Sequence, residues 1–459
     1  MRNSSEGPRA EVPAEAWSFV DERIVRLDRS GPFFDDYDAG AAYELIYQAI
    51  DPDVNALGFA ATRDVISFLK HEPSDANPAA GAIDHALAHG NSQSGRMLKG
   101  FIYWGFNEDE DGQIMFEGAN PNISGAHAIA LNERFGDANA TSRPYENHTI
   151  GKIEFPFTYE VRTDPITGAT DGIRARCGET ETCPKVIHTD SGNEAWQKAA
   201  SLVVTDGQGN DIELPEDVRV YYFASTQHGP AGTPSFGICQ QLSNPNPWAP
   251  NLQALIVALD AWATEGKEPP DSRHPMAADG TLVPALPQTV QGFPQIPGVT
   301  YNGLFNQVQV LDKTSQPYQP VPGTEYVVLV PRTDADGNDV AGVRSIDVQV
   351  PLATYTGWGL RAPGFAEGED CGLQGQSMPF AGTRRSDWRR ATRACRSRSA
   401  TAATAPMSAG WRGRRSARSP SGSCSPTMPT RPSRPRARAG SARSEMKGVP
   451  GRRLTSIWC

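Results

Sequence analysis

Gly90-Asn91-Ser92-Gln93-Ser94-Gly95-Arg96 is the stretch that decides the fold of this 459-residue chain. A serine with small residues two positions away on each side is typical of a sharp strand-to-helix turn, where larger side chains do not fit. Residues 97–103 continue it as an amphipathic helix, with apolar side chains at 97, 98, 101 and 102. The N-terminus of such a helix favours an oxyanion formed at the serine. The alternative is a Gly/Ser segment that only caps a helix.

Steric considerations favour Ser92 over Ser94 as the nucleophile. With Ser92 at the centre, the residues two positions away are Gly90 and Ser94, which are both small. With Ser94 at the centre, one of them is Arg96, which is too large for the crowded side of the turn. We therefore expect Ser92 to be the nucleophile and the backbone N–H of Gln93 to contact the oxyanion.

Seven other short motifs accompany this stretch in a fixed order. Together they resemble a bacterial family known as "alpha/beta hydrolase domain", whose substrate is largely unassigned, over about residues 15–383. The resemblance implies an α/β-hydrolase-like fold, with a mostly parallel sheet and helices on both faces, and a loop-rich insertion. The motifs are Gly58-Phe59-Ala60-Ala61-Thr62-Arg63-Asp64, Gly105-Phe106-Asn107-Glu108-Asp109-Glu110, Asn132-Glu133-Arg134-Phe135, Glu194-Ala195-Trp196, Ser225-Thr226-Gln227-His228-Gly229, Pro269-Pro270-Asp271-Ser272-Arg273 and Arg361-Ala362-Pro363-Gly364-Phe365.

A serine nucleophile needs a base, and in this fold an acid and then a histidine follow the serine along the chain. Residues 218–224 are β-branched and aromatic, which predicts a buried strand, and His228 lies on the loop after it. We expect His228 to be the general base. The alternative is a loop histidine that is hydrogen-bonded locally.

The acid has two main candidates on the loop after a second predicted strand at 184–188. Asp190 precedes Ser-Gly, where an aspartate usually makes a local turn. The family resemblance, with a glutamate two residues before a tryptophan, favours Glu194 and leaves Asp190 as the alternative acid. Asp206 is a third, weaker candidate.

These residues predict a serine hydrolase, an esterase-like acyl hydrolase that cleaves a small-molecule ester through an acyl-enzyme. The alternative is a catalytically inactive hydrolase-like protein or a binding module. No His-Gly-Gly type loop precedes Ser92, and the resembling family carries a longer N-terminal region. We therefore expect the chain to begin inside the domain, and the second oxyanion donor stays open.

The charge distribution divides the chain into unlike parts. Residues 384–459 hold 18 Arg and one Lys against two acidic residues, whereas residues 1–383 carry a net charge of about −27. We expect a disordered N-terminus at 1–14, an α/β-hydrolase domain at 15–383 with a Pro/Gly-rich insertion at 267–325, and a disordered tail at 384–459. The tail has a single lysine, no aromatic residues apart from Trp388, Trp411 and Trp458, and no Arg-Gly-Gly repeat, so we expect no nucleic-acid partner. We interpret it as translation out of frame.

No stretch predicts a membrane span or a signal peptide. The default expectation is a cytoplasmic protein without a membrane partner, or a secreted one if the true N-terminus is missing. The spacing of Cys177 and Cys183 allows a small disulfide loop or two free thiols, and gives too few ligands for zinc.

Residues 334–339 (Asp-Ala-Asp-Gly-Asn-Asp) begin like a calcium loop. The twelfth position is Ser345 rather than glutamate, so a hairpin turn between strands at 326–330 and 343–348 explains the segment better. We expect no metal and no cofactor.

Overall fold

The computed structural model describes residues 1–380 and 455–458, apart from 5–6, 23, 46–53, 55, 130, 132–152 and 315–317. The motif expected to start at Asn132 and all of the Arg-rich tail before residue 455 lie outside these residues.

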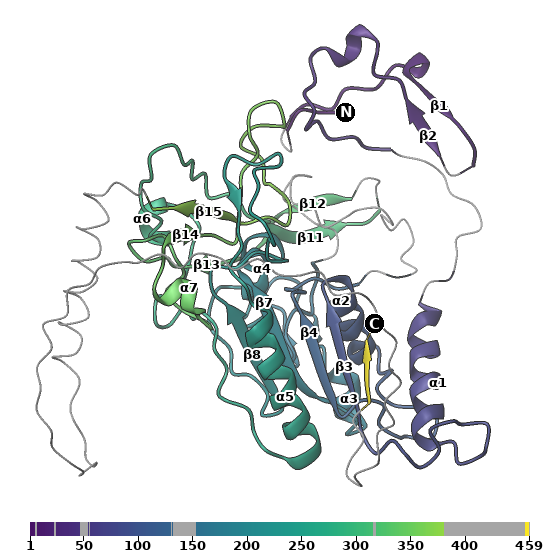
Figure 1. Cartoon of the computed structure of the whole chain (residues 1–459). Helices are drawn as coiled ribbons and strands as arrows, with labels where there is room; N and C mark the ends of the chain where they lie inside the picture. The colour runs from purple at the N-terminus through teal and green to yellow at the C-terminus, as the bar shows by residue number, and fades with distance from the viewer. Residues whose placement is uncertain are drawn as a thin grey trace, which may run out of the picture. The chain divides into compact units, whose positions relative to one another are not determined.

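A parallel sheet forms the centre of the molecule (Figure 1). Its strands pair in the order β16, β3, β4, β7 and β8, and every neighbouring pair is parallel. This arrangement confirms the predicted α/β class. The strands are β16 (Thr455–Trp458), β3 (Ala86–Asn91), β4 (Gly118–Asn122), β7 (Lys185–Ser191) and β8 (Val218–Phe223).

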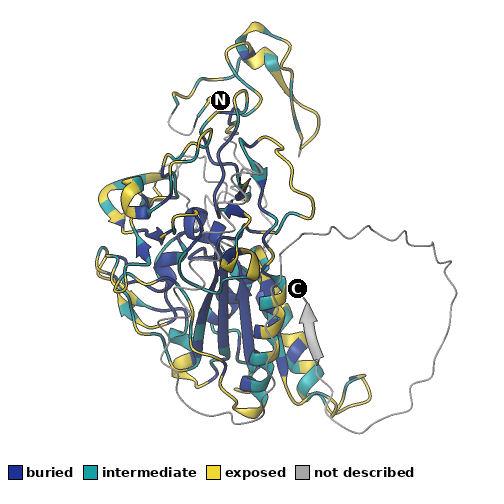
Figure 2. Ribbon diagram, turned by 60° about the vertical axis from the view of Figure 1, so that its left-hand side comes forward, coloured by how far each residue is buried: buried dark blue, intermediate teal, exposed yellow. Residues whose placement is uncertain are grey.

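Helices cover both faces of this sheet, because successive strand residues point to opposite sides. In β7, Val186 packs in the cluster that includes Phe59 and Phe101, whereas Ile187 packs in the cluster that includes Leu259. The first cluster holds α1 and α2 on one face, and the second holds α5 on the other. Between them, β4 is buried along its whole length, and β7 and β8 are each buried at all but one residue (Figure 2). The helices are α1 (Leu57–His71), α2 (Gln93–Tyr103), α3 (Ala175–Glu179) and α5 (Ala249–Glu265).

Smaller elements gather beyond the carboxyl ends of the central strands (Figure 1). Residues 346–349 form α7 there, so the strand expected at 343–348 is wrong. Only Val343 makes a strand-like bridge, to Phe223 at the end of β8. The elements are α4 (Gly192–Gln197), α6 (Gln288–Gln291), α7 (Ile346–Gln349), β9 (Leu242–Ser243), β10 (Leu282–Val283), β11 (Val308–Asp312), β12 (Gln319–Tyr326), β13 (Val330–Pro331), β14 (Ala353–Tyr355) and β15 (Gln376–Pro379).

The Pro/Gly-rich segment at 267–325 packs against the helix that follows β7. Its Tyr301 ring lies 6.2 Å from the ring of Trp196 in α4 and 5.5 Å from that of Trp358. Phe293 lies 5.2 Å from Trp358 and completes the aromatic cluster. The aromatic residues of this segment therefore support α4.

The first residues of the chain pack against residues near position 40. Met1 is buried with Phe34 in a small apolar cluster, and Arg2 forms a backbone bridge with Ala42. The other described strands form two antiparallel pairs, β1 (Trp17–Phe19) with β2 (Val25–Leu27) and β5 (Arg162–Thr163) with β6 (Thr170–Asp171).

None of the described helices combines the length and the apolar composition needed to cross a membrane.

Candidate active site

Ser92 stands at a sharp turn between β3 and α2. Its φ of 56° and ψ of −112° place a non-glycine residue in a region that L-amino acids rarely adopt. A Cβ atom at Gly90 would collide with the backbone carbonyl of Ser94, so only glycine fits there. The backbone around Ser92 is therefore as crowded at position 90 as the sequence predicts.

The turn is fastened to the neighbouring strand β4. The backbone N–H of Ser92 donates to the carbonyl oxygen of Asn122 at 2.8 Å. At Gly95 a Cβ would lie 2.8 Å from the same carbonyl oxygen, which requires a second glycine in the turn. Gln93 is the first residue of α2, so its backbone N–H has no acceptor within the helix and can serve an oxyanion.

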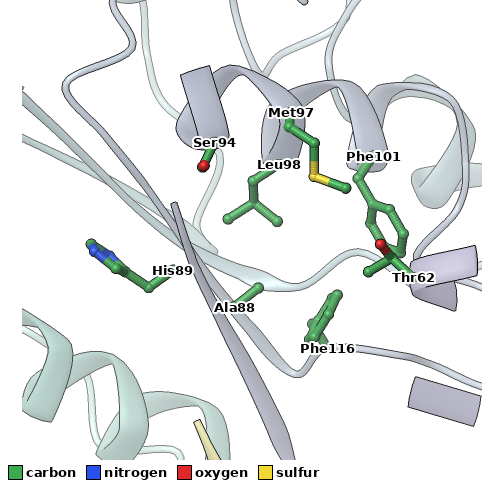
Figure 3. Close-up of a pocket in the computed structure, with 8 residues that line it drawn as sticks. All are labelled: Thr62, Ala88, His89, Ser94, Met97, Leu98, Phe101 and Phe116. Atoms are coloured by element: carbon green, nitrogen blue, oxygen red, sulfur yellow. The ribbon is translucent and has the colours of Figure 1, made fainter. Parts of the chain in front are cut away.

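Ser92 lies beside the predicted base. Its Oγ is 2.9 Å from Nε2 of His228, although the two residues are 136 positions apart in the chain. Ser94 makes no side-chain hydrogen bond among the described residues. It lines a separate cavity between α1, β3 and α2, together with His89 (Figure 3). The two serines therefore face different surroundings, and only Ser92 is paired with a histidine.

Glu194 lies on the other side of the imidazole. Its Oε1 is 2.5 Å from Nδ1 of His228, and its side chain is fully buried. The backbone N–H of Ser191 donates to the second carboxylate oxygen, Oε2, at 3.1 Å, and the Ser191 hydroxyl donates to the same atom. The first of these bonds is half of a capping box at the start of α4, and in the other half the Ser191 side chain accepts from the helix backbone.

Trp248 and Asp339 hold the loop that carries His228. Trp248 Nε1 donates to the carbonyl oxygens of Gln227 and His228, at 3.2 Å in both cases. Ser225, which has a φ of 54°, exchanges hydrogen bonds with the buried Asp339: its N–H donates to Oδ2, and its Oγ accepts from the Asp339 N–H at 2.7 Å. Burial raises the pKa of Asp339 to about 6.

The structure places the alternative acid elsewhere. Asp190 Oδ2 lies 2.7 Å from Nε2 of His188, and its Oδ1 accepts from the backbone N–H of Gly125 at 2.9 Å. Tyr159 completes this buried chain, with its hydroxyl 2.9 Å from Nδ1 of His188. Asp190 therefore bonds a structural histidine rather than making the local turn expected from its sequence. Asp206 forms a surface turn with Gln208 and Asn210.

Two buried lysines, Lys198 and Lys99, lie near the carboxylates of Glu194 and Asp190. Burial lowers the pKa of Lys198, one turn after Glu194, to about 7, and the Glu194 charge opposes that shift. Burial likewise lowers the pKa of Lys99 to about 7, and its Nζ donates to the carbonyl oxygen of Gly125 at 2.5 Å. Among the described residues, no group of three or more His, Cys, Asp and Glu is arranged to hold a metal ion.

Sequence reasoning overlooked the groups that hold Glu194 and the loop of His228. The pattern Ser191-Gly-Asn-Glu194 is a capping-box signature and could have been recognised. Trp248 and Asp339 carry no local signal, because they reach the histidine loop from 20 and 114 residues away in the chain.

Two disulfides occur among the described residues. Cys177 bonds Cys183, which resolves the choice that their spacing left open, and Cys239 bonds Cys371.

Comparison with known proteins gives one match. The model of a family described as "alpha/beta hydrolase domain" matches residues 16–411. The match extends past residue 383, where we expected the resemblance to end. No curated protein and no solved structure matches the chain.

Proposed function

This chain belongs to the alpha/beta hydrolase domain family, and from that premise we propose that it is a serine hydrolase that cleaves carboxylic esters through Ser92, His228 and Glu194. The observation that carries the proposal is the continuous contact from Ser92 Oγ to His228 Nε2 (2.9 Å) and from His228 Nδ1 to Glu194 Oε1 (2.5 Å). The three residues follow three different strands, β3, β7 and β8. Their chain order is the one expected for this fold.

In the first half of the proposed reaction, Ser92 Oγ attacks the ester carbonyl carbon while His228 Nε2 takes the hydroxyl proton. The tetrahedral oxyanion accepts a hydrogen bond from the Gln93 backbone N–H, at the positive end of α2. The imidazolium then gives its proton to the leaving alcohol as the C–O bond breaks. Ser92 is left esterified.

In the second half, His228 removes a proton from water, and the resulting hydroxide equivalent attacks the acyl-enzyme. The acid forms as the Ser92 Oγ–acyl bond breaks and His228 returns the proton to Oγ. Glu194 holds the imidazole with Nδ1–H toward itself and stabilises the charge that develops on the ring. Its burial keeps water from competing for that contact.

A fluorophosphonate probe tests the proposal, because it phosphonylates only an activated serine. We expect labelling of the native chain at Ser92, located by peptide mapping, and none in Ser92→Ala or His228→Ala. Ser94→Ala is the matched control and should label at the wild-type rate. A folded native chain that is not labelled would point to the inactive hydrolase-like alternative, and labelling elsewhere would overturn the assignment of Ser92.

A series of p-nitrophenyl esters then defines the acyl specificity. Hydrolysis that disappears in Ser92→Ala would establish the ester as a substrate.

A further inference from the structure

We propose that the Cys239–Cys371 disulfide is a positioning element for the triad: it fastens segment 357–376 against both the helix of Glu194 and the loop of His228. The inference rests on the proposed function for its effect on activity. Its effect on the two elements themselves can be measured without activity.

The segment holds the acid helix α4 at both of its ends. At the start, Asn193 Nδ2 donates to the carbonyl oxygen of Gly357 at 2.9 Å. At the end, Gln197 Nε2 donates to Asp370 Oδ1 at 2.9 Å and also to the carbonyl oxygen of Gly372. Both donors are buried, so no water can replace these bonds. Glu194 therefore lies on a helix whose two ends depend on segment 357–376.

The same segment holds the base loop. The side-chain oxygen of Gln227, the residue before His228, accepts from the backbone N–H of Gly375 at 3.1 Å and from that of Asn244 at 2.9 Å. Asn244 Nδ2 in turn donates to the carbonyl oxygens of Thr356 and Ser225, both at 2.9 Å. Segment 357–376 therefore binds both the helix that carries Glu194 and the loop that carries His228.

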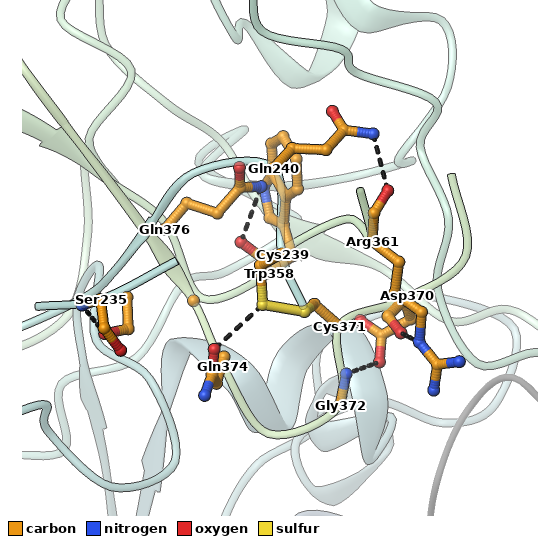
Figure 4. The surroundings of a disulfide bond; sticks show 12 residues. Ser235, Cys239, Gln240, Trp358, Arg361, Asp370, Cys371, Gly372, Gln374 and Gln376 are labelled. Carbon is orange, nitrogen blue, oxygen red and sulfur yellow. Dashed lines mark hydrogen bonds between the residues drawn. A yellow bond between two sulfur atoms is a disulfide. The ribbon is translucent and has the colours of Figure 1, made fainter. Parts of the chain in front are cut away.

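Along the chain, Cys371 lies between Gly357 and Gly375, which bind the two elements, and Figure 4 shows the surroundings of the disulfide. Cys371 stands between Asp370 and Gly372, the two acceptors of Gln197, and Cys239 lies on the loop that continues from His228. Their Cα atoms are 5.8 Å apart across a sequence separation of 132.

The crosslink adds to hydrogen bonds between the two cysteine segments: the Gln240 N–H donates to the Leu360 carbonyl oxygen at 2.8 Å, and the Ala362 N–H donates to that of Ile238 at 2.9 Å. Between β14 and β15 the described chain has only isolated bridges, at Leu360–Asp370 and at Cys239–Arg361. A covalent bond removes most of the freedom that such an irregular segment would have. Loss of the bond should let α4 and the histidine loop move apart by small amounts, and a misplacement of about 1 Å can cost about 100-fold in rate.

The test compares two double variants, Cys239→Ser/Cys371→Ser and Cys177→Ser/Cys183→Ser. The second is a matched control, because Cys177 lies in α3 and Cys183 precedes β7 at the end away from Ser92. At a temperature where circular dichroism shows both folded, we expect fluorophosphonate labelling of Ser92 to slow at least about tenfold in the first variant only. For an ester substrate, kcat should fall and KM should stay near the wild-type value.

Amide hydrogen exchange provides the readout that does not need activity. We expect faster exchange at residues 192–197 and 225–228 in Cys239→Ser/Cys371→Ser, and unchanged exchange there in the control. If the native chain is not labelled but exchange follows this pattern, the proposed function fails and the positioning role stands. Wild-type rates of both labelling and exchange in the first variant would overturn the positioning role.

Reduction of the native chain covers the case in which the first variant does not fold. Dithiothreitol supplies two electrons and two protons, so the Cys239–Cys371 bond becomes two thiols and the reagent closes to its own disulfide. Alkylation and peptide mapping show which bond has opened. Labelling should slow in step with opening of Cys239–Cys371, whereas full-rate labelling of a folded chain with that bond open would contradict the proposal.

Discussion

Ser191 binds one carboxylate oxygen of Glu194 and leaves the other for His228. The Ser191 N–H and hydroxyl both donate to Oε2, while Oε1 faces the imidazole at 2.5 Å. One side chain therefore caps a helix and orients a histidine. The fold and the proposed chemistry share this contact, so a change in either partner should affect both.

Ser191→Ala should lower the stability of the chain slightly and the rate of fluorophosphonate labelling much more. The loss of a helix cap typically costs about 1 kcal/mol of stability. The loss of a hydrogen bond to a charged group is worth about 1.5–3 kcal/mol, which corresponds to a labelling rate that falls by at least about tenfold. Urea unfolding and fluorophosphonate kinetics measure the two quantities. The control is Ser67→Ala. Ser67 lies on α1, and its hydroxyl donates to the carboxylate of Asp109. Equal labelling of both variants would argue against an orienting role for Ser191.

Glu194→Gln and Asp190→Asn should differ sharply in their effect on activity. An amide opposite Nδ1 favours the wrong imidazole tautomer, and the corresponding change in a Ser-His-Asp triad costs about 10,000-fold in kcat. Asp190 bonds His188 and Gly125 instead, so Asp190→Asn should lower stability while the labelling rate stays within a few fold of wild type. If Asp190→Asn proved as inactive as Glu194→Gln while folded, the acid would have to be reassigned.

Gly90→Ala should damage the turn that presents Ser92. The added methyl group would collide with the Ser94 carbonyl, and overpacking of this kind typically costs about 1–3 kcal/mol. Gly58→Ala is the matched control, since a Cβ at Gly58 in α1 meets nothing within 4 Å. That variant should be stabilised by about 0.5–1 kcal/mol. Thermal unfolding distinguishes them, and a neutral Gly90→Ala would mean that the turn can relax.

The parts that could be predicted from sequence depend on local patterns. The crowding around Ser92 follows from residues within four positions of it, and β8 follows from the run at 218–224. The spacing of Leu252, Leu255 and Leu259, all buried on α5, is a local pattern of the same kind. Each of these features is decided by neighbours in the chain, so a single sequence contains enough information.

The parts that could not be predicted depend on contacts between distant residues. The run at 343–348 has strand-forming residues, yet Ser345 precedes a helical turn, and its hydroxyl donates to Asn246 Oδ1 at 2.7 Å from 99 positions away. Asp190 has the sequence of a local turn, but Gly125, 65 positions away, donates its buried backbone N–H to the carboxylate. Cys239 and Cys371 are 132 residues apart, and spacing alone cannot pair cysteines at that distance.

The two disulfides favour an oxidising compartment over the cytoplasm, because cytosolic thiols are kept reduced. All four cysteines in residues 1–380 are paired. We therefore predict that the chain purified from its native source without reductant resists alkylation at these four positions and reacts there only after denaturation and reduction. Mass spectrometry of the alkylated peptides measures this. Quantitative alkylation of the unreduced, denatured chain would restore the cytoplasmic expectation.

Asp339 gives the loop of His228 a pH-dependent support. Burial raises the pKa of its carboxyl to about 6, above the value of 3.8 for an exposed aspartate. Between those pH values the folded chain holds a proton that the unfolded chain has lost, so stability falls as the pH rises through this window and stays lower above it.

Asp339→Asn should remove that pH dependence. The asparagine oxygen can still accept from the Ser225 N–H and the Tyr222 hydroxyl, and the side chain has no proton to lose. From pH 4 to pH 7 the variant should therefore gain up to about 3 kcal/mol relative to wild type, the equivalent of about two pKa units. Urea unfolding at both pH values gives the difference. Parallel pH profiles for the two chains would show that Asp339 does not titrate in this range.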